Sequence, residues 1–156
     1  MINSATLKLI KEFEGLSLKP YYCSAKKLTI GYGHVSDDYY EVKQGVTIDE
    51  AKAEELLIHD LREAEDTLQR QFPSWETLNE NQYGALLSLV YNLGSLKIYN
   101  KEKKKFTDRT ILIKLKKNDL KGAAEAFLLY NKGGGKVLPG LTKRRKAEKL
   151  LFETPV

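Results

Sequence analysis

The stretch that most constrains this chain is residues 12–34, EFEGLSLKPYYCSAKKLTIGYGH, where a helix end carrying a carboxylate runs directly into a β hairpin. Apolar helical spacing stops at Glu14, and Gly15 can adopt the left-handed conformation that ends a helix. A helix C-terminus carries negative partial charge, so a carboxylate there is disfavoured by about 0.3–1 kcal/mol compared with a cation. Because functional sites often break such local rules, Glu14 is a candidate functional residue.

The second half of this stretch, residues 27–35, mixes β-forming residues with Gly31 and Gly33. This pattern predicts a twisted hairpin whose backbone comes close to a ligand. Two polar side chains, Cys23 and Thr29, fall in the same stretch downstream of Glu14.

The 156 residues, 42% of them hydrophobic, are enough for one domain with its own core. The single cysteine excludes an internal disulfide, so folding in a reducing cytosol is expected. The N-terminal sequence MINSATLKLIKEFEG has no recognisable export signal, and no stretch reaches the roughly 18 apolar residues of a membrane span. No stable membrane insertion is therefore expected.

The charge of the chain is unevenly distributed. Residues 95–149 contain 17 Lys and Arg against 5 Asp and Glu, whereas the rest of the chain is net acidic. A basic C-terminal half suits a polyanionic partner, although a solvated surface of mixed charges would give the same composition.

Caps and apolar periodicity predict the helices. Asn3 or Ser4 caps the first helix, and Thr47 with Glu50 forms a capping box that opens a long helix over residues 48–71. Asn79 with Gln82 opens a helix that is apolar on nearly all sides and should be central and buried. The remaining predicted segments are a short helix from Thr107 or Asp108 to about Lys116, a helix from the Asp119 cap to Tyr130, a loop at GGGKVLPG, and a last helix over residues 141–152.

These segments predict an α+β chain that is mostly α-helical and forms a single domain, residues 1–156. A β-containing lobe spans about residues 15–60, and a helical lobe combines residues 1–14 with 72–156. The long helix over residues 48–71 would link the two lobes, since about 1.5 Å per residue lets it span a small domain.

Three blocks carry a resemblance to a known family, namely FEGLSLKPYYCSAKKLTIGYGH, NQYGALLSLVYNLG and GGGKVLPGLTKRRKAEKLLF. In this order they resemble the phage-type lysozymes, the endolysins of glycoside hydrolase family 24, and the similarity covers nearly the whole chain. The resemblance implies a two-lobed lysozyme-like fold with a small β-hairpin lobe, a larger helical lobe and the glycan lying between them.

The resemblance also implies a catalytic triad of Glu14, Cys23 and Thr29, with Arg144 rather than Arg145 as a supporting partner of Glu14. One departure from the family is that LSLKPYYCSAKKLT lacks the glycine that many relatives carry between the Cys and the Thr, which leaves the local turn geometry open.

Glycosidic bond cleavage needs a proton for the leaving oxygen and an attacking group on the opposite face of the sugar. We assign Glu14 as the general acid, and Cys23 and Thr29 as the groups that hold the attacking water, which would invert the anomeric centre. Glu12 is expected to be solvated, and His34 to brace the hairpin through hydrogen bonds. A thiol nucleophile formed by Cys23 and His34 is an alternative without an identifiable orienting residue.

No cofactor and no metal are expected, because His34, Asp37, Asp38 and His59 match no standard ligand spacing, and His59 is predicted to lie on a helix surface. The sequence therefore predicts a monomeric, bacteriolytic muramidase that cleaves the β-1,4 bond between N-acetylmuramic acid and N-acetylglucosamine of peptidoglycan during host cell lysis. It would accumulate in the host cytoplasm and act on the cell wall in the periplasm. A lytic transglycosylase and a non-catalytic glycan- or nucleic-acid-binding module stay open as alternatives, although no nucleic-acid motif is recognised.

Overall fold

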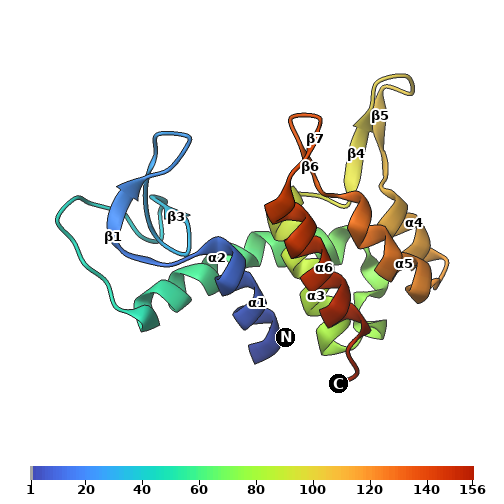
Figure 1. Ribbon diagram of the computed structural model, residues 1–156, viewed down its shortest axis with the longest axis horizontal. Coiled ribbons are helices and arrows are strands. Elements are labelled where there is room, and N and C mark those ends of the chain that lie inside the picture. The colour runs from blue at the N-terminus through green and yellow to red at the C-terminus, as the bar shows by residue number, and fades with distance from the viewer. Residues whose placement is uncertain (1) are drawn as a thin grey trace. The chain divides into compact units, whose positions relative to one another are not determined.

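The computed structural model describes residues 2–156 and contains six α-helices and three small antiparallel sheets within that range (Figure 1). Two compact units make up the chain. One combines the N-terminal residues up to Leu9 with Ala64–Val156, and we call it the helical unit; the other, Ile10–Glu63, we call the β unit.

The first helix, α1, covers Ser4–Glu14, as its spacing predicts. Asn3 caps it, since its side-chain oxygen accepts a hydrogen bond from the Thr6 backbone N–H at 3.0 Å. At the other end Gly15 has φ +74° and donates its N–H to the Lys11 carbonyl. The predicted stop directly after Glu14 is therefore confirmed.

The β unit contains a three-stranded sheet in the order β1 (Ser17–Tyr22), β2 (Leu28–Gly31) and β3 (His34–Val35). The predicted hairpin is thus present, with β2 in the centre and β1 at an edge, where Pro20 is tolerated. Gly31, at φ +70°, packs against α2, and a Cβ there would lie 3.5 Å from the Ala53 backbone.

Helix α2 covers Glu50–Gln71, two residues shorter at its start than predicted. The capping box of Thr47 and Glu50 was wrong, because Asp49 takes the cap position and accepts a hydrogen bond from the Lys52 N–H at 2.7 Å. The apolar stripe of the helix is buried as expected except for Ala51, which is exposed.

The helical unit is organised around α3 (Glu80–Leu93), which is buried along most of its length. Its predicted capping box is present, with Asn79 accepting from the Gln82 N–H and Gln82 accepting from the Asn79 N–H, and Gly94 ends it at φ +90°.

Helix α6 (Pro139–Glu153) packs along α3 and begins two residues before its predicted start, with Pro139 in its first turn. Asp119 caps α5 (Leu120–Ala126) as predicted, but that helix gives way to a 3-10 turn at Phe127–Leu129 instead of reaching Tyr130.

Two hairpins in the helical unit were not predicted. Strands β4 (Lys97–Asn100) and β5 (Lys105–Asp108) pair where a helix start was expected at Thr107 or Asp108, so α4 begins only at Thr110 and runs to Lys116. The predicted GGGKVLPG loop instead contains strands β6 (Lys132–Gly133) and β7 (Lys136–Val137). Gly134 and Gly135 both have positive φ, which a tight two-residue hairpin turn requires. A further 3-10 turn, Pro73–Thr77, connects α2 to α3.

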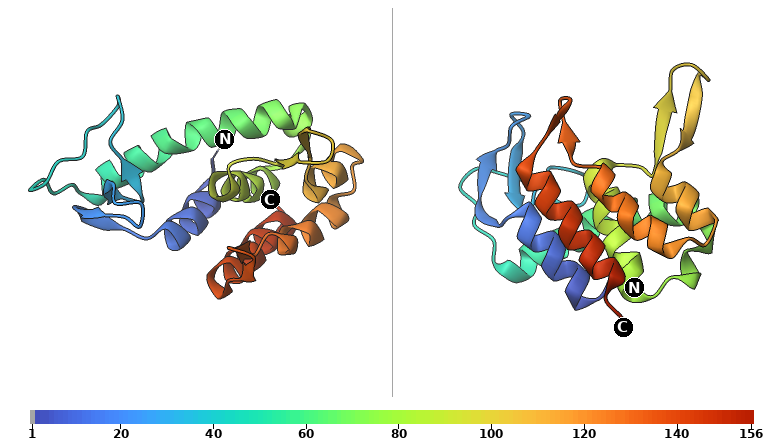
Figure 2. Two further views of the ribbon diagram at one scale, coloured as in Figure 1. Left: turned by 90° about the horizontal axis from the view of Figure 1, so that it is seen from above. Right: turned by 45° about the vertical axis from the view of Figure 1, so that its right-hand side comes forward.

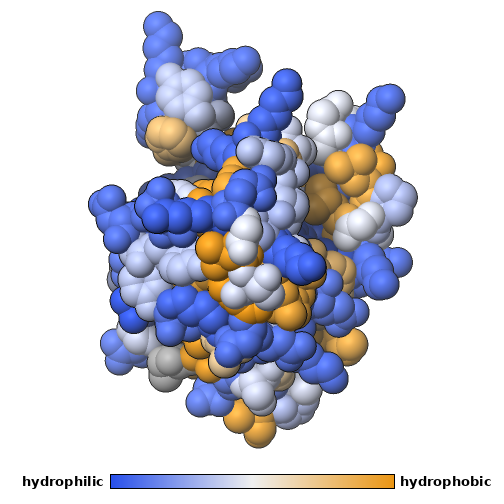
Figure 3. Space-filling view, turned by 90° about the vertical axis from the view of Figure 1, so that its left-hand side faces the viewer, coloured by the Kyte–Doolittle hydropathy of each residue, from blue (hydrophilic) through white to orange (hydrophobic). Residues whose placement is uncertain are grey.

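Hydrophilic side chains predominate on the face shown in Figure 3, and apolar side chains form small separate groups there. Leu61 and Leu68 of α2 and Leu86 of α3 are instead completely buried. Burial of these side chains supplies the main stabilisation of the fold.

Candidate functional site

Glu14 is the last residue of α1 and lies half-buried, whereas Glu12 is exposed as predicted. One turn earlier, Lys11 Nζ lies 2.6 Å from Glu54 Oε1 of α2 and 5.7 Å from the centre of the Tyr32 ring. The Glu54 carboxylate raises the pKa of Lys11. These contacts fix the end of α1, and with it the backbone of Glu14, within the β unit.

Cys23 and Thr29 are brought together by the turn that joins β1 to β2. The Cys23 N–H donates to the Lys27 carbonyl at 3.0 Å, and the Lys26 N–H donates to the Cys23 carbonyl at 2.8 Å. Lys26 has a φ of +62°, a left-handed conformation that favours glycine. The turn thus forms although no glycine lies between Cys23 and Thr29. The positive φ of this turn is therefore carried by Lys26, a residue with a full side chain.

The Thr29 side chain is almost fully buried, at 2% exposure, and its hydroxyl donates to the Lys27 carbonyl at 2.9 Å. The pKa of the Cys23 thiol is lowered, first by a hydrogen bond from the Lys27 backbone N–H and then by the Thr29 hydroxyl and the Ala25 N–H. Because the Thr29 hydroxyl has one proton and two acceptors, it can exchange between the Lys27 carbonyl and the Cys23 sulfur. The two side chains thus form one polar group at the end of β2.

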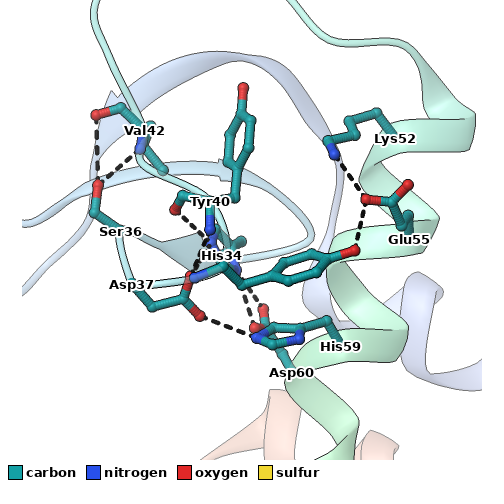
Figure 4. A network of polar contacts seen from close by, with 10 residues as sticks. His34, Ser36, Asp37, Tyr40, Val42, Lys52, Glu55, His59 and Asp60 are labelled. Carbon is teal, nitrogen blue, oxygen red and sulfur yellow. Dashed lines mark hydrogen bonds and ion pairs between the residues drawn. The ribbon is translucent and has the colours of Figure 1, made fainter.

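His34 is the centre of a polar network that ties β3 to α2 (Figure 4). Its Nδ1 lies 2.9 Å from both carboxylate oxygens of Asp60, and its Nε2 lies 3.2 Å from the Tyr40 carbonyl. The ring is 2% exposed, and burial raises the pKa of Asp60 while His34 opposes that rise. His34 is therefore held at both nitrogens, which agrees with a bracing role and leaves neither nitrogen for Cys23.

Asp37 and His59 extend this network on the side of the Tyr40 loop. Asp37 Oδ1 accepts from the Tyr40 N–H at 2.8 Å and from the Tyr39 N–H at 3.0 Å, and these bonds, led by that of Tyr40, lower the pKa of Asp37. Its other oxygen lies 3.2 Å from His59 Nε2. The Tyr39 ring stacks on His59 with centroids 3.9 Å apart, and the His59 side chain keeps 27% exposure, so it lies at the surface of α2 partly covered by Tyr39.

Three residues of the network, His34, Asp37 and Asp60, each offer one ligand atom, and these atoms lie within 4.8 Å of one another. The spacing of the sequence did not reveal this group, because Asp60 comes from α2, 26 residues after His34. Hydrogen bonds among the members and to the Tyr40 loop account for the arrangement.

Arg144, the predicted supporting residue, lies in the helical unit within a buried charged cluster. Its Nε lies 3.3 Å from Glu148 Oε2, and the same oxygen accepts from the Ser88 hydroxyl at 2.5 Å. Arg145 is fully buried, its Nε lies 2.8 Å from Glu148 Oε1, and its guanidinium donates to Asn92 Oδ1 at 2.6 Å. Burial raises the pKa of Glu148 and lowers that of Arg145. The sequence pointed to Arg144 but did not indicate Ser88 or Glu148, which fix its side chain.

Comparison with known proteins decides the family. The family model described as phage lysozyme matches residues 11–148, a range that includes Glu14, Cys23, Thr29, His34 and Arg144. The chain belongs to the phage lysozyme family. The predicted phage-type lysozyme is therefore confirmed.

Relatives and solved structures agree with this family assignment. This phage lysozyme is 39% identical to the endolysin of Acyrthosiphon pisum secondary endosymbiont phage 1 over 157 residues, with 98% of each chain covered. A crystal structure of a P22 lysozyme variant matches with a TM-score of 0.79 and 34% identity over 99% of both chains. The muramidase domain of SpmX from Asticaccaulis excentricus matches with a TM-score of 0.76 and 28% identity, again over 99% of both chains.

These structural matches also confirm the predicted α+β, mostly helical, lysozyme-like fold. Among the described residues of this phage lysozyme, no helix combines the length and apolar character that crossing a membrane requires.

Proposed function

We propose that this phage lysozyme hydrolyses the β-1,4 bond between N-acetylmuramic acid and N-acetylglucosamine in peptidoglycan. Its similarity over nearly the full length to an endolysin, and to a muramidase domain, supports this substrate. Glu14 is the proposed general acid that protonates the leaving oxygen. Its place at the end of α1, fixed by the Lys11–Glu54 ion pair, suits an acid that must keep one orientation.

The observation that carries the mechanism is the joined pair of Cys23 and Thr29. A retaining glycosidase usually needs a carboxylate about 5–5.5 Å from the acid as its nucleophile, and neither residue supplies one. Thr29 is buried and its hydroxyl is held by the Lys27 carbonyl, so it can orient a water but has no base to activate it for attack. We therefore assign the attack to a water held by the two side chains. The water passes its proton to the Cys23 sulfur, whose pKa is lowered, while the glycosidic bond breaks and Glu14 protonates the leaving oxygen, and this single displacement gives inversion.

A cysteine nucleophile is the second candidate, because the pKa of the Cys23 thiol is lowered. Thiolate attack on the sugar would form a covalent intermediate and retain the anomeric configuration. His34 would not assist it, since its ring nitrogens face Asp60 and the Tyr40 carbonyl.

One digest of purified peptidoglycan tests these proposals. Mass spectrometry of the released fragments should find reducing N-acetylmuramic acid ends, and NMR recorded before mutarotation should find the α anomer first. An initial β anomer would contradict attack by water and favour a thiolate. Anhydromuramic ends would identify a lytic transglycosylase, and the absence of any cleavage would leave only a glycan-binding module.

His34 and Arg144 are proposed as supporting residues. His34 joins β3 to Asp60 of α2, and β3 pairs with the strand that carries Thr29, so loss of the imidazole would loosen the position of Thr29. Arg144 is oriented by Glu148 and Ser88 within the helical unit. Both roles predict that variants lose activity while retaining a folded state.

We further propose that the protein acts as a monomer on the cell wall in the periplasm, after accumulating in the host cytoplasm and being released by a separate membrane-permeabilising factor. Its resemblance to endolysins supports this route. Fractionation of expressing cells before and after membrane permeabilisation, together with light scattering of the purified protein, tests both statements.

A further inference from the structure

The β4–β5 hairpin projects away from the helices of its own unit in both Figure 1 and Figure 2. Its base is well anchored, since the Leu96 N–H donates to Gln71 Oε1 at 2.7 Å and the Arg109 N–H donates to the Leu96 carbonyl at 2.9 Å. A free two-stranded hairpin is at best marginally stable in water, so these bonds at the base fix its position. The arms beyond the base face solvent.

Three large apolar side chains on the arms are exposed: Ile98 and Tyr99 at 50% each, and Phe106 at 66%. Tyr99 and Phe106 are directly opposite in the strand register, so both rings lie on one face of the hairpin, with centroids 5.3 Å apart and planes at 76°. Within the described part of the chain this pair has no further ring partner.

Positive charge gathers at the tip of the same hairpin. Lys101, Lys103, Lys104 and Lys105 are all exposed, and none of them makes an ion pair within residues 2–156. At the base, in contrast, Asp108 pairs with Lys97 at 3.6 Å and with Lys116 at 2.7 Å. The tip is ordered, because Asn100 Oδ1 accepts from the Lys103 N–H at 2.9 Å. Glu102 in the same turn offsets one of these four lysines, so a net charge of +3 is held beside the exposed rings.

We propose that the β4–β5 hairpin is an accessory docking surface for an anionic peptidoglycan strand, a partner that rests on the proposed function. The tip lysines pair with carboxylates of the stem peptides, and the rings of Tyr99 and Phe106 pack against the apolar faces of sugars. Both contacts act outside the residues assigned to catalysis, so the surface contributes to binding of the polymer and leaves the chemical step unchanged.

The arrangement favours this partner over a membrane or a nucleic acid. A hairpin that inserts into a bilayer would present its apolar residues first, whereas here the lysines occupy the tip and the apolar residues lie behind them. Proteins that bind single-stranded nucleic acids stack successive bases on aromatic rings. The rings of Tyr99 and Phe106 are nearly perpendicular, so they do not form such a stacking platform.

Two hairpin variants and one charge-matched control test the proposal. The first variant combines Lys101→Gln, Lys103→Gln and Lys105→Gln, and the second combines Tyr99→Ser with Phe106→Ser. The control replaces three exposed lysines elsewhere, Lys43→Gln, Lys117→Gln and Lys121→Gln, and so removes the same charge. All the replaced lysines are exposed, so the melting temperatures of the lysine variant and of the control should stay close to that of the wild type.

Binding is measured by co-sedimentation with insoluble peptidoglycan in the cold, and turnover is measured separately on a short neutral oligosaccharide. The lysine variant should bind peptidoglycan at least about fivefold more weakly than the charge-matched control at low salt. The affinity of the ring variant for peptidoglycan should fall by a similar factor, and this loss should persist at high salt. Turnover on the oligosaccharide should stay within about twofold of the wild type in all variants.

The docking surface would be overturned if the hairpin variants and the control bound peptidoglycan equally well. It would also be overturned if the hairpin variants lost binding only to phosphatidylglycerol vesicles, or only to a single-stranded oligonucleotide. Failure of the proposed function would look different. In that case the wild-type protein itself would cleave neither peptidoglycan nor the oligosaccharide.

Discussion

Lys26 donates its backbone N–H to the Cys23 carbonyl while holding φ at +62°, so the turn that presents Cys23 carries a left-handed residue with a full side chain. This conformation costs a non-glycine residue about 1–2 kcal/mol. The turn is thus formed without a glycine, and stability can be gained at Lys26.

Lys26→Gly should raise the free energy of unfolding by about 0.5–1 kcal/mol, because relief of the strain outweighs the added freedom of glycine in the unfolded chain. The neighbouring change Lys27→Gly has no positive φ to relieve and should lower stability by about 0.5–1 kcal/mol. Urea unfolding of both variants measures the difference. A loss of stability in Lys26→Gly would show that the Lys26 side chain contributes more than its backbone costs.

Gly84 of α3 packs against Thr6 of α1 within the helical unit. A Cβ on Gly84 would overlap Thr6 Oγ1 and lie 2.8 Å from Thr6 Cβ, while the Thr6 hydroxyl is tied to Asn3 Oδ1 at 2.8 Å. Gly84→Ala should therefore destabilise the protein by about 1–3 kcal/mol through overpacking. Gly140→Ala is the matched control, because no atom lies within 4 Å of its added Cβ. As Gly140 lies in helix α6, that change should stabilise by up to about 1 kcal/mol in thermal unfolding.

Features fixed by neighbouring residues could be predicted from the sequence. Gly15 ends α1, the Asn79 and Gln82 side chains cap α3, and Asp119 caps α5, all within a few residues of the backbone groups that they serve. The error at Thr47 has the same origin, because Asp49 is a second capping residue only two positions away and the sequence did not rank them.

Features fixed by distant residues could not be predicted. Asp60 meets His34 across 26 residues, and Glu148 meets Ser88 across 60, so no local pattern marks either partner. The β4–β5 hairpin was missed because each strand has only four residues and the lysine-rich turn between them, residues 101–104, contains no glycine. Its base is fixed instead by Gln71, 25 residues before Leu96.

Glu14→Gln should lower the rate of peptidoglycan hydrolysis by at least about 100-fold, because it removes the proposed acidic proton from a side chain of nearly the same size. Far-UV circular dichroism and the melting temperature should change little. Glu12→Gln, two residues earlier and exposed, removes the same charge and should keep activity. Retention of more than a few percent of activity in Glu14→Gln would reject Glu14 as the acid.

The lowered pKa of the Cys23 thiol predicts early alkylation. The rate at which iodoacetamide alkylates Cys23 should rise with pH. The pH midpoint of this rise should lie below the ordinary thiol pKa of 9.0 in the folded protein and should be higher in the unfolded chain. Thr29→Ala should move the folded midpoint upward and reduce activity, because the hydroxyl that stabilises the thiolate is lost. Thr29→Ser keeps the hydroxyl and should preserve both properties.

If Cys23 holds water and does not attack the sugar, its chemistry can be replaced. Cys23→Asp should lyse permeabilised cells, and Cys23→Ser should keep partial activity. Inactivity of both variants, combined with a substrate adduct on Cys23 in mass spectra of the wild type, would establish the nucleophile instead.

The two aspartates around His34 should make opposite contributions to the pH dependence of stability. Hydrogen bonds from the Tyr40 and Tyr39 N–H groups lower the pKa of Asp37 below its ordinary value of 3.8, so its contribution is present above pH 3.8 and is lost as the pH falls. Burial raises the pKa of Asp60, so the folded state holds its proton more tightly, and stability falls as the pH rises from 3.8 to the raised value. Urea unfolding from about pH 3 to about pH 5.5 should therefore show a shallower rise with pH in Asp37→Asn and a steeper one in Asp60→Asn than in the wild type. Asp38→Asn controls for the loss of one negative charge. Slopes that change in the same direction in Asp37→Asn and Asp60→Asn would mean that burial does not dominate at Asp60.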